Sequence, residues 1–421
     1  MARRLLLAAA PVAALALAGV WLATGPVPVD PDPQAAPGDA ALAEKLAALG
    51  YAEWVEENAA TAGRSGVTRH DPGRTWPGLN LFNSRLEREA FLLDMEGRIV
   101  HRWAAAGLDG SWQHIELGPA GDLFVIAEDG YLARLDWDSR VLWKRELRAH
   151  HDLAIGPARE IYVLDRQVVD IPHGDGTIPI VDDGIAVLEP DGSLRTRYSI
   201  HALFGARVPG ETLEAIAGEL RQRSVQELED LRIIDIFHTN TVEVLDRDLG
   251  NLPTKGDILI CVKRLDLIAI VDLDEGRIEW SWGPGELDKP HQPTLTADGR
   301  ILVFDNGTGR GYSRVVEVDP LRGEIVWQYE AEPRESFYSE TRGGSQKLPN
   351  GNVLVTEANR GRVFEVTRDG QVVWEFYNPN TRAEEGFQRG AIYRMTRIDE
   401  SAVEAIRALN AGSRSAPAPG R

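Results

Sequence analysis

A repeated strand-turn-strand unit that ends in an aromatic residue constrains the fold of this chain more than any other feature. Each copy has an apolar strand, a tight turn containing Gly or Asp, a second apolar strand and then Trp, which Tyr198 replaces once. The copies span residues 91–103, 131–143, 184–198, 267–280, 314–327 and 362–374. Repetition of this kind indicates neighbouring copies of one supersecondary unit.

A second unit lies between successive copies and consists of two apolar strands around a turn of Gly, Pro, Asn or Asp. Residues 117–125 and 348–355 are examples. Four short strands per unit, repeated six times, are typical of a six-bladed β-propeller, whereas a sandwich would lack this self-similarity. We therefore predict an all-β fold, with a six-bladed propeller over residues 78–400.

Two stretches interrupt the repeat. Residues 165–183 are polar and contain several Asp and Pro residues, so we expect a long loop there. The apolar residues at about 205–233 have helical spacing, which predicts a helical insertion near one end of the propeller. Residues 391–398 are expected to add a strand that closes the ring against residues 78–82. Residues 401–421 are expected to form a C-terminal helix and a disordered tail.

The N-terminus combines a short basic segment with a long uncharged run. Arg3 and Arg4 precede a stretch without charges from Leu5 to Val29. This pattern predicts that residues 1–29 are a signal peptide or a transmembrane anchor. The body would then be exported, either membrane-anchored facing the periplasm or cell exterior, or secreted if the signal is cleaved. Residues 30–77 are predicted to be a linker with a short helix between Asp39 and about Glu57.

Charge and cysteine content exclude two classes of function. The formal net charge is −19, from 65 acidic and 46 basic residues, so we expect no nucleic-acid partner. Cys261 is the single cysteine, which rules out an intrachain disulfide and a cysteine metal cluster.

Three histidines occupy one position of the second unit when its copies are aligned on the first apolar strand residue. The aligned residues are Leu117, Ile155, Val242, Leu295 and Leu348. Four positions upstream lie Gln113, His151, His238, His291 and Gly344. The innermost strand of each propeller blade lines the central channel, so this alignment brings the three histidines to one mouth of the channel. A register error of one residue would instead select His150 or His114.

Three convergent histidines are compatible with several kinds of chemistry. Neutral imidazoles can ligate a metal, act as acid, base or nucleophile, or when protonated bind an anion. They can also be structural, hydrogen-bonded residues of the channel. Lys263 and Arg264 end a predicted strand, which would put one side chain on each face and allow one cation to point into the channel.

A longer pattern around these residues resembles the bacterial arylsulfate sulfotransferase family. It consists of Asp235-Ile236-Phe237-His238-Thr239-Asn240, a strand with basic residues, His291, and a strand that ends in Phe304-Asp305-Asn306-Gly307. The stretches 343–351 and 373–376 are also similar to it, and the likeness covers about residues 78–379. The resemblance implies a six-bladed propeller that moves a sulfuryl group from a phenolic sulfate ester to a phenol, so the partners would be small phenols and aryl sulfates. It implies no nucleotide sulfate donor, and we expect no cofactor and no metal.

The resemblance also implies roles for individual residues. His291 matches the histidine that is transiently sulfated, His238 and His151 match two supporting histidines, and Asn240 matches a substrate-binding residue in the same His-x-Asn motif. The arginine of the family falls on Lys263 or Arg264. Two other hypotheses stay open, namely a non-catalytic exported propeller that binds a ligand or a protein, and an enzyme with a histidine-ligated metal.

Overall fold

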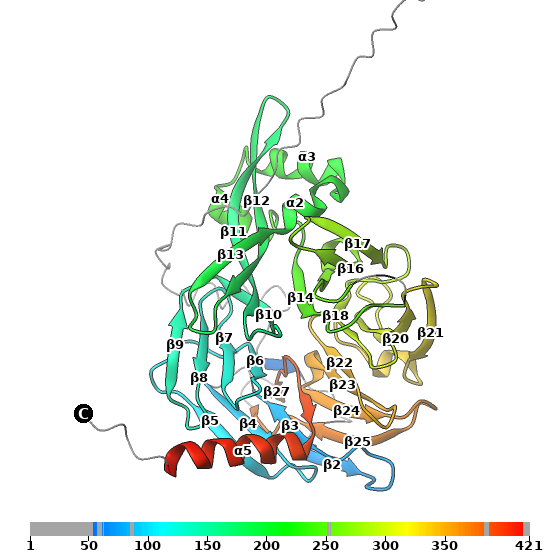
Figure 1. Ribbon diagram of the computed structural model, residues 1–421. Coiled ribbons are helices and arrows are strands. Elements are labelled where there is room, and N and C mark those ends of the chain that lie inside the picture. Colours follow the sequence, from blue (N-terminus) through cyan, green and yellow to red (C-terminus); the bar gives the residue numbers. More distant parts are fainter. Residues whose placement is uncertain are drawn as a thin grey trace, which may run out of the picture.

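The protein has an all-β architecture of small antiparallel sheets. The computed structural model describes residues 54–56, 61, 63–84, 88–250, 252, 254–382 and 387–415. These residues form six sheets of four or five strands and one sheet of three strands. The six larger sheets follow one another around the molecule in sequence order, from the blue sheet at the bottom of Figure 1 through green and yellow to orange.

The first three sheets contain four strands each. Sheet 1 has the order β28 (Thr396–Ile398), β3 (Leu79–Phe82), β4 (Glu89–Leu93), β5 (Ile99–Ala104). Sheet 2 has the order β6 (His114–Leu117), β7 (Leu123–Ile126), β8 (Leu132–Leu135), β9 (Val141–Arg145). Sheet 3 has the order β10 (Ala149–Ile155), β11 (Ile161–His173), β12 (Gly176–Leu188), β13 (Leu194–Ser199).

The next three sheets repeat this plan, and the last one gains a fifth strand. Sheet 4 has the order β14 (Thr239–Val244), β15 (Ile258–Val262), β16 (Leu267–Asp272), β17 (Arg277–Trp282). Sheet 5 has the order β18 (His291–Leu295), β19 (Ile301–Asp305), β20 (Arg314–Asp319), β21 (Glu324–Tyr329). Sheet 6 has the order β22 (Gly344–Lys347), β23 (Val353–Glu357), β24 (Arg362–Val366), β25 (Val372–Tyr377), β2 (Gly66–His70).

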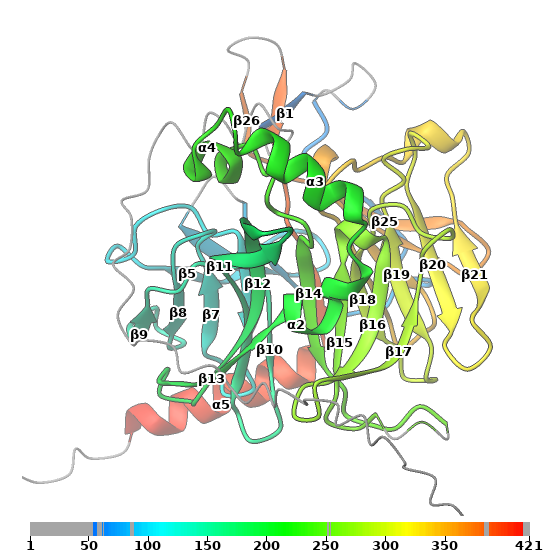
Figure 2. The same ribbon diagram turned by 90° about the horizontal axis from the view of Figure 1, so that it is seen from above.

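A small sheet and several helices complete the described part of the chain. The small sheet has the order β1 (Trp54–Glu56), β27 (Gln388–Gly390), β26 (Thr381–Arg382). The helices are α2 (Ile200–Phe204), α3 (Gly210–Glu219), α4 (Val225–Asp230) and α5 (Glu400–Ser415), and the 3-10 turns are η2 (Gly205–Arg207), η3 (Lys263–Leu265), η4 (Arg334–Ser336) and η5 (Ala358–Arg360). Figure 2 shows α5 and the small sheet on opposite sides of the six larger sheets.

A ring of hydrogen bonds joins the six larger sheets, and the repeated aromatic residue supplies four of these bonds. In every larger sheet a side chain of the fourth strand bonds to the turn between the third and fourth strands of the next sheet, and sheet 6 bonds back to sheet 1. The pairs are His101 with Trp137, Trp143 with Pro190, Tyr198 with Asp274, Trp282 with Gly323, Trp327 with Arg368, and Trp374 with Met95. The repeated aromatic residue therefore joins neighbouring sheets at four of the six junctions. At the other two the bond comes from His101 and Trp282, which lie two residues from the repeated Trp103 and Trp280.

The chain ends meet where the sequence predicted closure. β28 pairs with β3, with Thr396 opposite Leu81 and Ile398 opposite Leu79, which confirms the closing strand expected at 391–398. The sheets begin earlier than residue 78, however, because β2 pairs with β25 and becomes the outer strand of sheet 6. The prediction of a short helix between Asp39 and about Glu57 is wrong at its C-terminal end, because Trp54–Glu56 forms strand β1.

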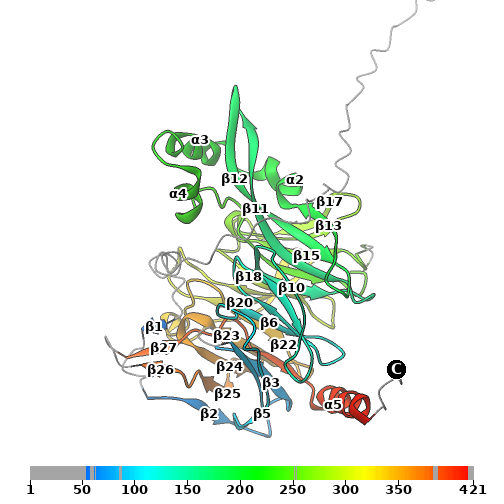
Figure 3. The same ribbon diagram turned by 90° about the vertical axis from the view of Figure 1, so that its left-hand side faces the viewer.

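Residues 165–183 extend β11 and β12 of sheet 3 into a long hairpin, so the prediction of a loop there is wrong. β11 and β12 pair continuously from Ile161 opposite Leu188 to His173 opposite Gly176. The β-branched residues between the Asp and Pro residues favour strands, and Gly174 takes the positive φ that the tip requires. The expected helices are confirmed as α3 and α4, and Figure 3 shows them beside the projecting hairpin. Ile216 and Leu228 bury their side chains in the core that contains this hairpin.

Both termini extend beyond the described residues. The predicted signal or anchor at 1–29 and most of the linker at 30–77 lie outside them, as does the end of the predicted tail at 416–421. The C-terminal helix is present as α5 and reaches Ser415. None of the helices in the described part of the chain has the length and apolar character that a membrane crossing needs.

Candidate active site

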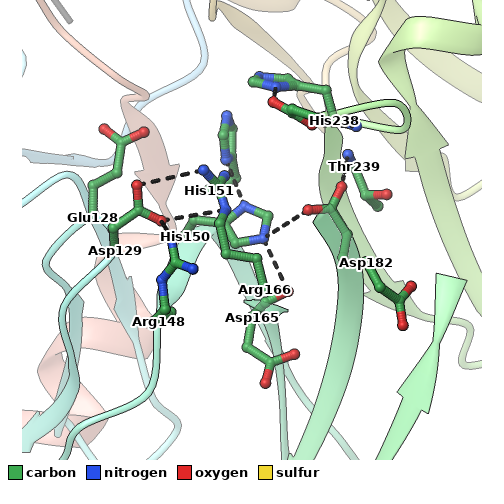
Figure 4. Close-up of polar contacts among 12 residues, drawn as sticks. Glu128, Asp129, Arg148, His150, His151, Asp165, Arg166, Asp182, His238 and Thr239 are labelled. Carbon is green, nitrogen blue, oxygen red and sulfur yellow. Dashed lines mark hydrogen bonds and ion pairs between the residues drawn. The ribbon is translucent and has the colours of Figure 1, made fainter. Parts of the chain in front are cut away.

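The structure brings the three predicted histidines together. His151 lies in β10, His238 directly precedes β14, and His291 begins β18. Their exposed fractions are 1%, 2% and 3%, and the ring centroids of His151 and His238 are 4.9 Å apart. A positive charge on His291 would lower the pKa of His151, and a positive charge on His238 would lower the pKa of His291. Figure 4 shows His150, His151 and His238 with the acidic residues around them.

The register used to align the histidines is wrong for His238. Strand pairing places Ile155 opposite Ile161, Val244 opposite Ile258, and Leu295 opposite Ile301. Counted from these strand ends, Asn240 is the residue equivalent to His151 and His291. His238 lies two residues further upstream.

Backbone conformation compensates for this offset. His238 has φ of 50° and His151 has φ of 57°, so both residues turn the chain in the left-handed region at the start of their strands. The irregular pairing at the start of β10, β14 and β18 accommodates these turns. Non-glycine residues in this conformation are uncommon and concentrate at functional sites.

The tautomer of His291 follows from its hydrogen bonds. The amide nitrogen Nδ2 of Asn306 donates to the carbonyl oxygens of Ser339 and Arg342, both at 2.7 Å, so its Oδ1 faces His291. Nδ1–H of His291 donates to this Oδ1 at 2.7 Å, and the carbonyl of Lys289 lies 3.3 Å from the same nitrogen. The proton therefore sits on Nδ1 and the lone pair on Nε2.

An aspartate three residues upstream fixes His238. Nδ1 of His238 lies 2.5 Å from Oδ2 of Asp235, and the backbone N–H of His238 donates to Oδ1 of Asp235 at 3.1 Å. Arg232 adds a bond to Oδ2 of Asp235 at 3.4 Å. A carboxylate that accepts from Nδ1–H orients the ring and leaves Nε2 as the basic nitrogen.

His151 is held by its sequence neighbour. Nδ1 of His151 lies 2.7 Å from Nδ1 of His150, while Nε2 of His150 lies 3.2 Å from the carbonyl oxygen of Asp165. A carbonyl can only accept, so His150 is protonated on Nε2 and accepts the Nδ1–H of His151. In all three predicted histidines the Nδ1 proton is engaged by the protein and Nε2 carries the lone pair.

Lys263 and Arg264 occupy the 3-10 turn η3 rather than the end of a strand, so the prediction of one side chain on each strand face is wrong. β15 ends at Val262, where the chain turns to reach β16. Nη2 of Arg264 donates to the carbonyl of Arg232 at 2.9 Å, which ties Arg264 to the loop before His238. Lys263 is the cation whose charge acts on both His238 and His291.

Asn240 supports the loop that carries His291. Its Nδ2 donates to the carbonyl of Pro290 at 2.9 Å, and its Oδ1 accepts from Oγ1 of Thr241 at 3.0 Å. Cys261 reaches the same carbonyl with its Sγ at 3.1 Å. The amide of Asn240 thus positions the residue before His291.

A small cleft lies next to Asp235, the aspartate that holds His238. It has a volume of about 70 Å³ and is lined by Asp235, Arg166 and Arg232 together with Gln226, Glu229 and Asp230 of α4. Glu229 forms an ion pair with Arg148 at 2.5 Å, which fastens α4 over this cleft. The helical insertion therefore covers the side of the site on which Asp235 lies.

The surroundings lower the pKa of all three histidines. Burial is the largest cause in each case, and the charge of Lys263 acts in the same direction on His291 and His238. The pKa of His238 falls to about 3, although Asp235 opposes the shift, and those of His151 and His291 fall well below their usual value. A lowered pKa keeps an imidazole neutral as the pH falls, so each of these rings is a neutral base with one N–H throughout the neutral range.

We expect all three rings to stay neutral when the pH is lowered from 8 to 5.5, with the proton of His238 and of His291 on Nδ1. The measurement is 15N-resolved NMR of histidine-labelled protein, with single substitutions to assign the signals. Imidazolium signals for these rings at pH 5.5 would contradict the prediction. Because the unfolded pKa is about 6.5 and the folded pKa is lower, the same rings also make folding less favourable as the pH drops below about 6.5.

Four residues of the site had no role assigned from the sequence: His150, Asp183, Asp235 and Asn306. Asp235 and Asn306 lie inside the motifs that carry the family resemblance, and a spacing of three between Asp235 and His238 is a usable signal. Asp183 of β12 lies 3.5 Å from Nε2 of His150 and accepts the backbone N–H of Thr239, and nothing in the local sequence marks it. Among the described residues, no group of three or more His, Cys, Asp or Glu side chains has an arrangement that could hold a metal ion.

The fold and site together define an all-β protein with a buried cluster of neutral histidines beside a lysine. The arylsulfotransferase (ASST) family model matches residues 128–379, more than half of the chain and including all three histidines. The chain belongs to the arylsulfotransferase family.

Other comparisons give distant similarity only. No curated protein sequence matches. Among solved structures, a Bacteroides caccae protein of unknown function is 14% identical with a TM-score of 0.48, covering 77% of this chain and 100% of its own. A virginiamycin B lyase from Staphylococcus aureus is 11% identical with a TM-score of 0.43, covering 82% and 98%. The Dos1 propeller is 10% identical with a TM-score of 0.38, covering 76% of each chain. TM-scores at this level carry no argument about function.

Proposed function

We propose that the protein transfers a sulfuryl group from a phenolic sulfate ester to a phenolic acceptor through a sulfated His291. The observation that carries the proposal is the hydrogen bond of 2.7 Å between Nδ1 of His291 and Asn306, which leaves Nε2 as a neutral nucleophile close to Lys263. Family membership supports the same chemistry, because an aryl sulfotransferase needs a nucleophile and a cation at one point.

The reaction has two halves. Nε2 of His291 attacks sulfur, the bond between sulfur and the phenolic oxygen breaks, and the phenoxide leaves with the electron pair and takes a proton. In the second half an acceptor phenol loses its proton, its oxygen attacks sulfur, and the bond between sulfur and Nε2 breaks. Because Asn306 keeps the proton on Nδ1, the sulfated ring is cationic and is a good leaving group. A neighbouring histidine, His238 or His151, exchanges the proton with the phenol in each half.

Lys263 is proposed as the cation that binds the sulfuryl oxygens. Replacing Lys263 by Met is expected to lower kcat/KM for an aryl sulfate by about 10²–10³-fold, because charge on these oxygens would lose its partner. Replacing Arg264 by Met is the matched control and should change kcat/KM far less, since Arg264 bonds to the backbone of Arg232. The reverse order of effects would assign the role to Arg264. Lys263→Arg tests whether a bidentate donor serves as well as a point charge.

We further propose that the six larger sheets are the blades of a six-bladed propeller, with residues 1–29 as an export signal or membrane anchor. The cyclic series of hydrogen bonds between successive sheets supports the number of blades. Arg3, Arg4 and the uncharged run after them support export to the periplasm or cell exterior.

The assay combines 4-nitrophenyl sulfate with a phenol acceptor and measures both products. We expect nitrophenol and the sulfated acceptor in equal amounts, with double-reciprocal plots that stay parallel as the acceptor concentration changes. Neither product forming with a range of aryl sulfates would contradict the proposal and favour a binding role. Intersecting plots would exclude a covalent intermediate.

A further inference from the structure

A chain of buried polar side chains continues from His151 away from His291. His151 contacts His150 through their two Nδ1 atoms at 2.7 Å, and Nε2 of His150 lies 3.5 Å from Oδ1 of Asp183. The exposed fractions of His150 and Asp183 are 0% and 1%. Figure 4 shows the two histidines side by side, with dashed contacts that lead from His150 toward Asp165 and the neighbouring carboxylate. The substrate would meet only the first member of this chain.

The surroundings of the chain disfavour an imidazolium ion. His151 lies among His150, His238, Arg166 and His291, each of which disfavours a positive charge on its ring in addition to burial. A histidine that exchanges a proton with a phenol must therefore either become a cation at high cost or pass the charge to another group. A second titratable group behind the ring provides that alternative.

We propose that His150 and Asp183 are relay residues that let His151 give and take the phenolic proton without becoming an imidazolium ion. This inference rests on the proposed sulfuryl transfer. Before the first half-reaction, protonated Asp183 donates to Nε2 of His150, Nδ1–H of His150 donates to Nδ1 of His151, and Nε2–H of His151 faces the substrate.

Three protons then move, one along each contact of the chain. The leaving phenoxide takes the proton from Nε2 of His151, Nδ1 of His151 takes the proton of His150, and Nε2 of His150 takes the proton of Asp183. Asp183 ends as a carboxylate and both rings end neutral, in the tautomers that the carbonyl of Asp165 favours. The acceptor phenol reverses every transfer in the second half-reaction, so a full cycle leaves the proton count unchanged.

Asp183 suits this role better than Asp235 does. Burial raises the pKa of Asp183 to about 7, and the Asp235 carboxylate adds to the shift while Arg166 opposes it. Its Oδ2 accepts the backbone N–H of Thr239 at 2.6 Å, which fixes the carboxyl group and leaves Oδ1 toward His150. In Asp235, burial is outweighed by His238, Arg166 and Arg232, which hold the pKa well below its usual range. Asp235 stays ionised, whereas Asp183 can hold a proton near neutral pH.

The test compares two donors in Asp183→Asn. Phenoxide has a conjugate acid with a pKa of about 10 and needs a proton to leave, whereas 4-nitrophenoxide is a weak base and needs none. We expect kcat/KM for phenyl sulfate to fall by about 10²-fold or more, with a much smaller fall for 4-nitrophenyl sulfate. An equal fall for both donors, or none for either, would overturn the relay.

Asp182→Asn is the matched control. Asp182 is the adjacent residue of β12, is also buried, and pairs with Arg197 instead of the histidines. It should leave the ratio of the two kcat/KM values unchanged, and a change as large as that in Asp183→Asn would overturn the assignment to Asp183.

A measurement on the unaltered protein covers the case in which Asp183→Asn does not fold. Turnover of phenyl sulfate in mixtures of H2O and D2O should give a curved dependence of rate on deuterium fraction, because several protons move together, and a straight line would overturn the relay. A protein that uses 4-nitrophenyl sulfate but shows neither effect refutes the relay alone. A protein that uses neither donor refutes the proposed function and the relay with it.

Discussion

Replacing His291 by Ala is expected to lower kcat/KM for 4-nitrophenyl sulfate by at least about 10⁴-fold, because the covalent intermediate can no longer form. The lone pair of Nε2 is directed by the hydrogen bond from Nδ1 to Asn306, and no other group in the proposed reaction attacks sulfur. Steady-state release of nitrophenol measures the loss. The melting temperature of the variant should change little by comparison, since the ring lies at the start of β18.

Two variants make this result specific. His173→Ala, at the hairpin end of β11, removes a histidine that contacts Glu214 and should leave turnover intact. His291→Gly leaves room for added imidazole, which should restore part of the donor cleavage by attacking sulfur from solution. Turnover in His291→Ala within tenfold of the unaltered protein would refute the assignment of the nucleophile.

Replacing Arg397 by Met is expected to destabilise the fold by about 3–5 kcal/mol, because it leaves the carboxylate of Glu365 buried without its partner. Both side chains have an exposed fraction of 0% in this ion pair, which joins the closing strand β28 to β24 of sheet 6. Arg397 also donates to Oδ1 of Asn80 at 2.9 Å and to the carbonyl of Trp76 at 3.0 Å. Unfolding in urea or guanidinium measures the change.

An exposed ion pair is the control for this prediction. Arg195 pairs with Glu189 at 2.6 Å, but their side chains are 44% and 41% exposed, so water screens the interaction. Arg195→Met should therefore cost less than about 1 kcal/mol. If Arg397→Met were as mild as Arg195→Met, the closing strand would not depend on the buried pair.

The aromatic repeat predicted the sheets because a side chain of the fourth strand bonds to the next sheet at each junction, and Trp or Tyr supplies that bond at five of the six. Trp143, Trp327 and Trp374 each donate from Nε1 to the next sheet, so selection for one hydrogen bond leaves a visible period in the sequence. The Asp and Pro residues of segment 165–183 favour a loop, but cross-strand pairing over the whole hairpin outweighs their preference. Pairing of β2 with β25 joins residues far apart in the chain, which local sequence does not reveal.

The histidine cluster was also predictable from the repeat, whereas the residues that support the histidines were not. Repeat alignment identified His151 and His291 at equivalent positions, whereas His238 reaches the cluster through a left-handed turn that no strand pattern predicts. The tautomers depend on Asn306, Asp235 and His150, whose roles follow only from three-dimensional contacts. The choice between Lys263 and Arg264 likewise depended on a 3-10 turn where a strand was expected.

The most direct test of the proposed mechanism is mass spectrometry of the peptide that contains His291 after brief exposure to an aryl sulfate. We expect one added sulfuryl group on His291, which disappears when a phenol is added while the phenol becomes sulfated. His291→Gln, which retains an amide able to bond Asn306 but has no nucleophilic nitrogen, should show no added group. An unmodified His291 peptide during active turnover, or a sulfuryl group on another residue that passes to the phenol, would contradict the account.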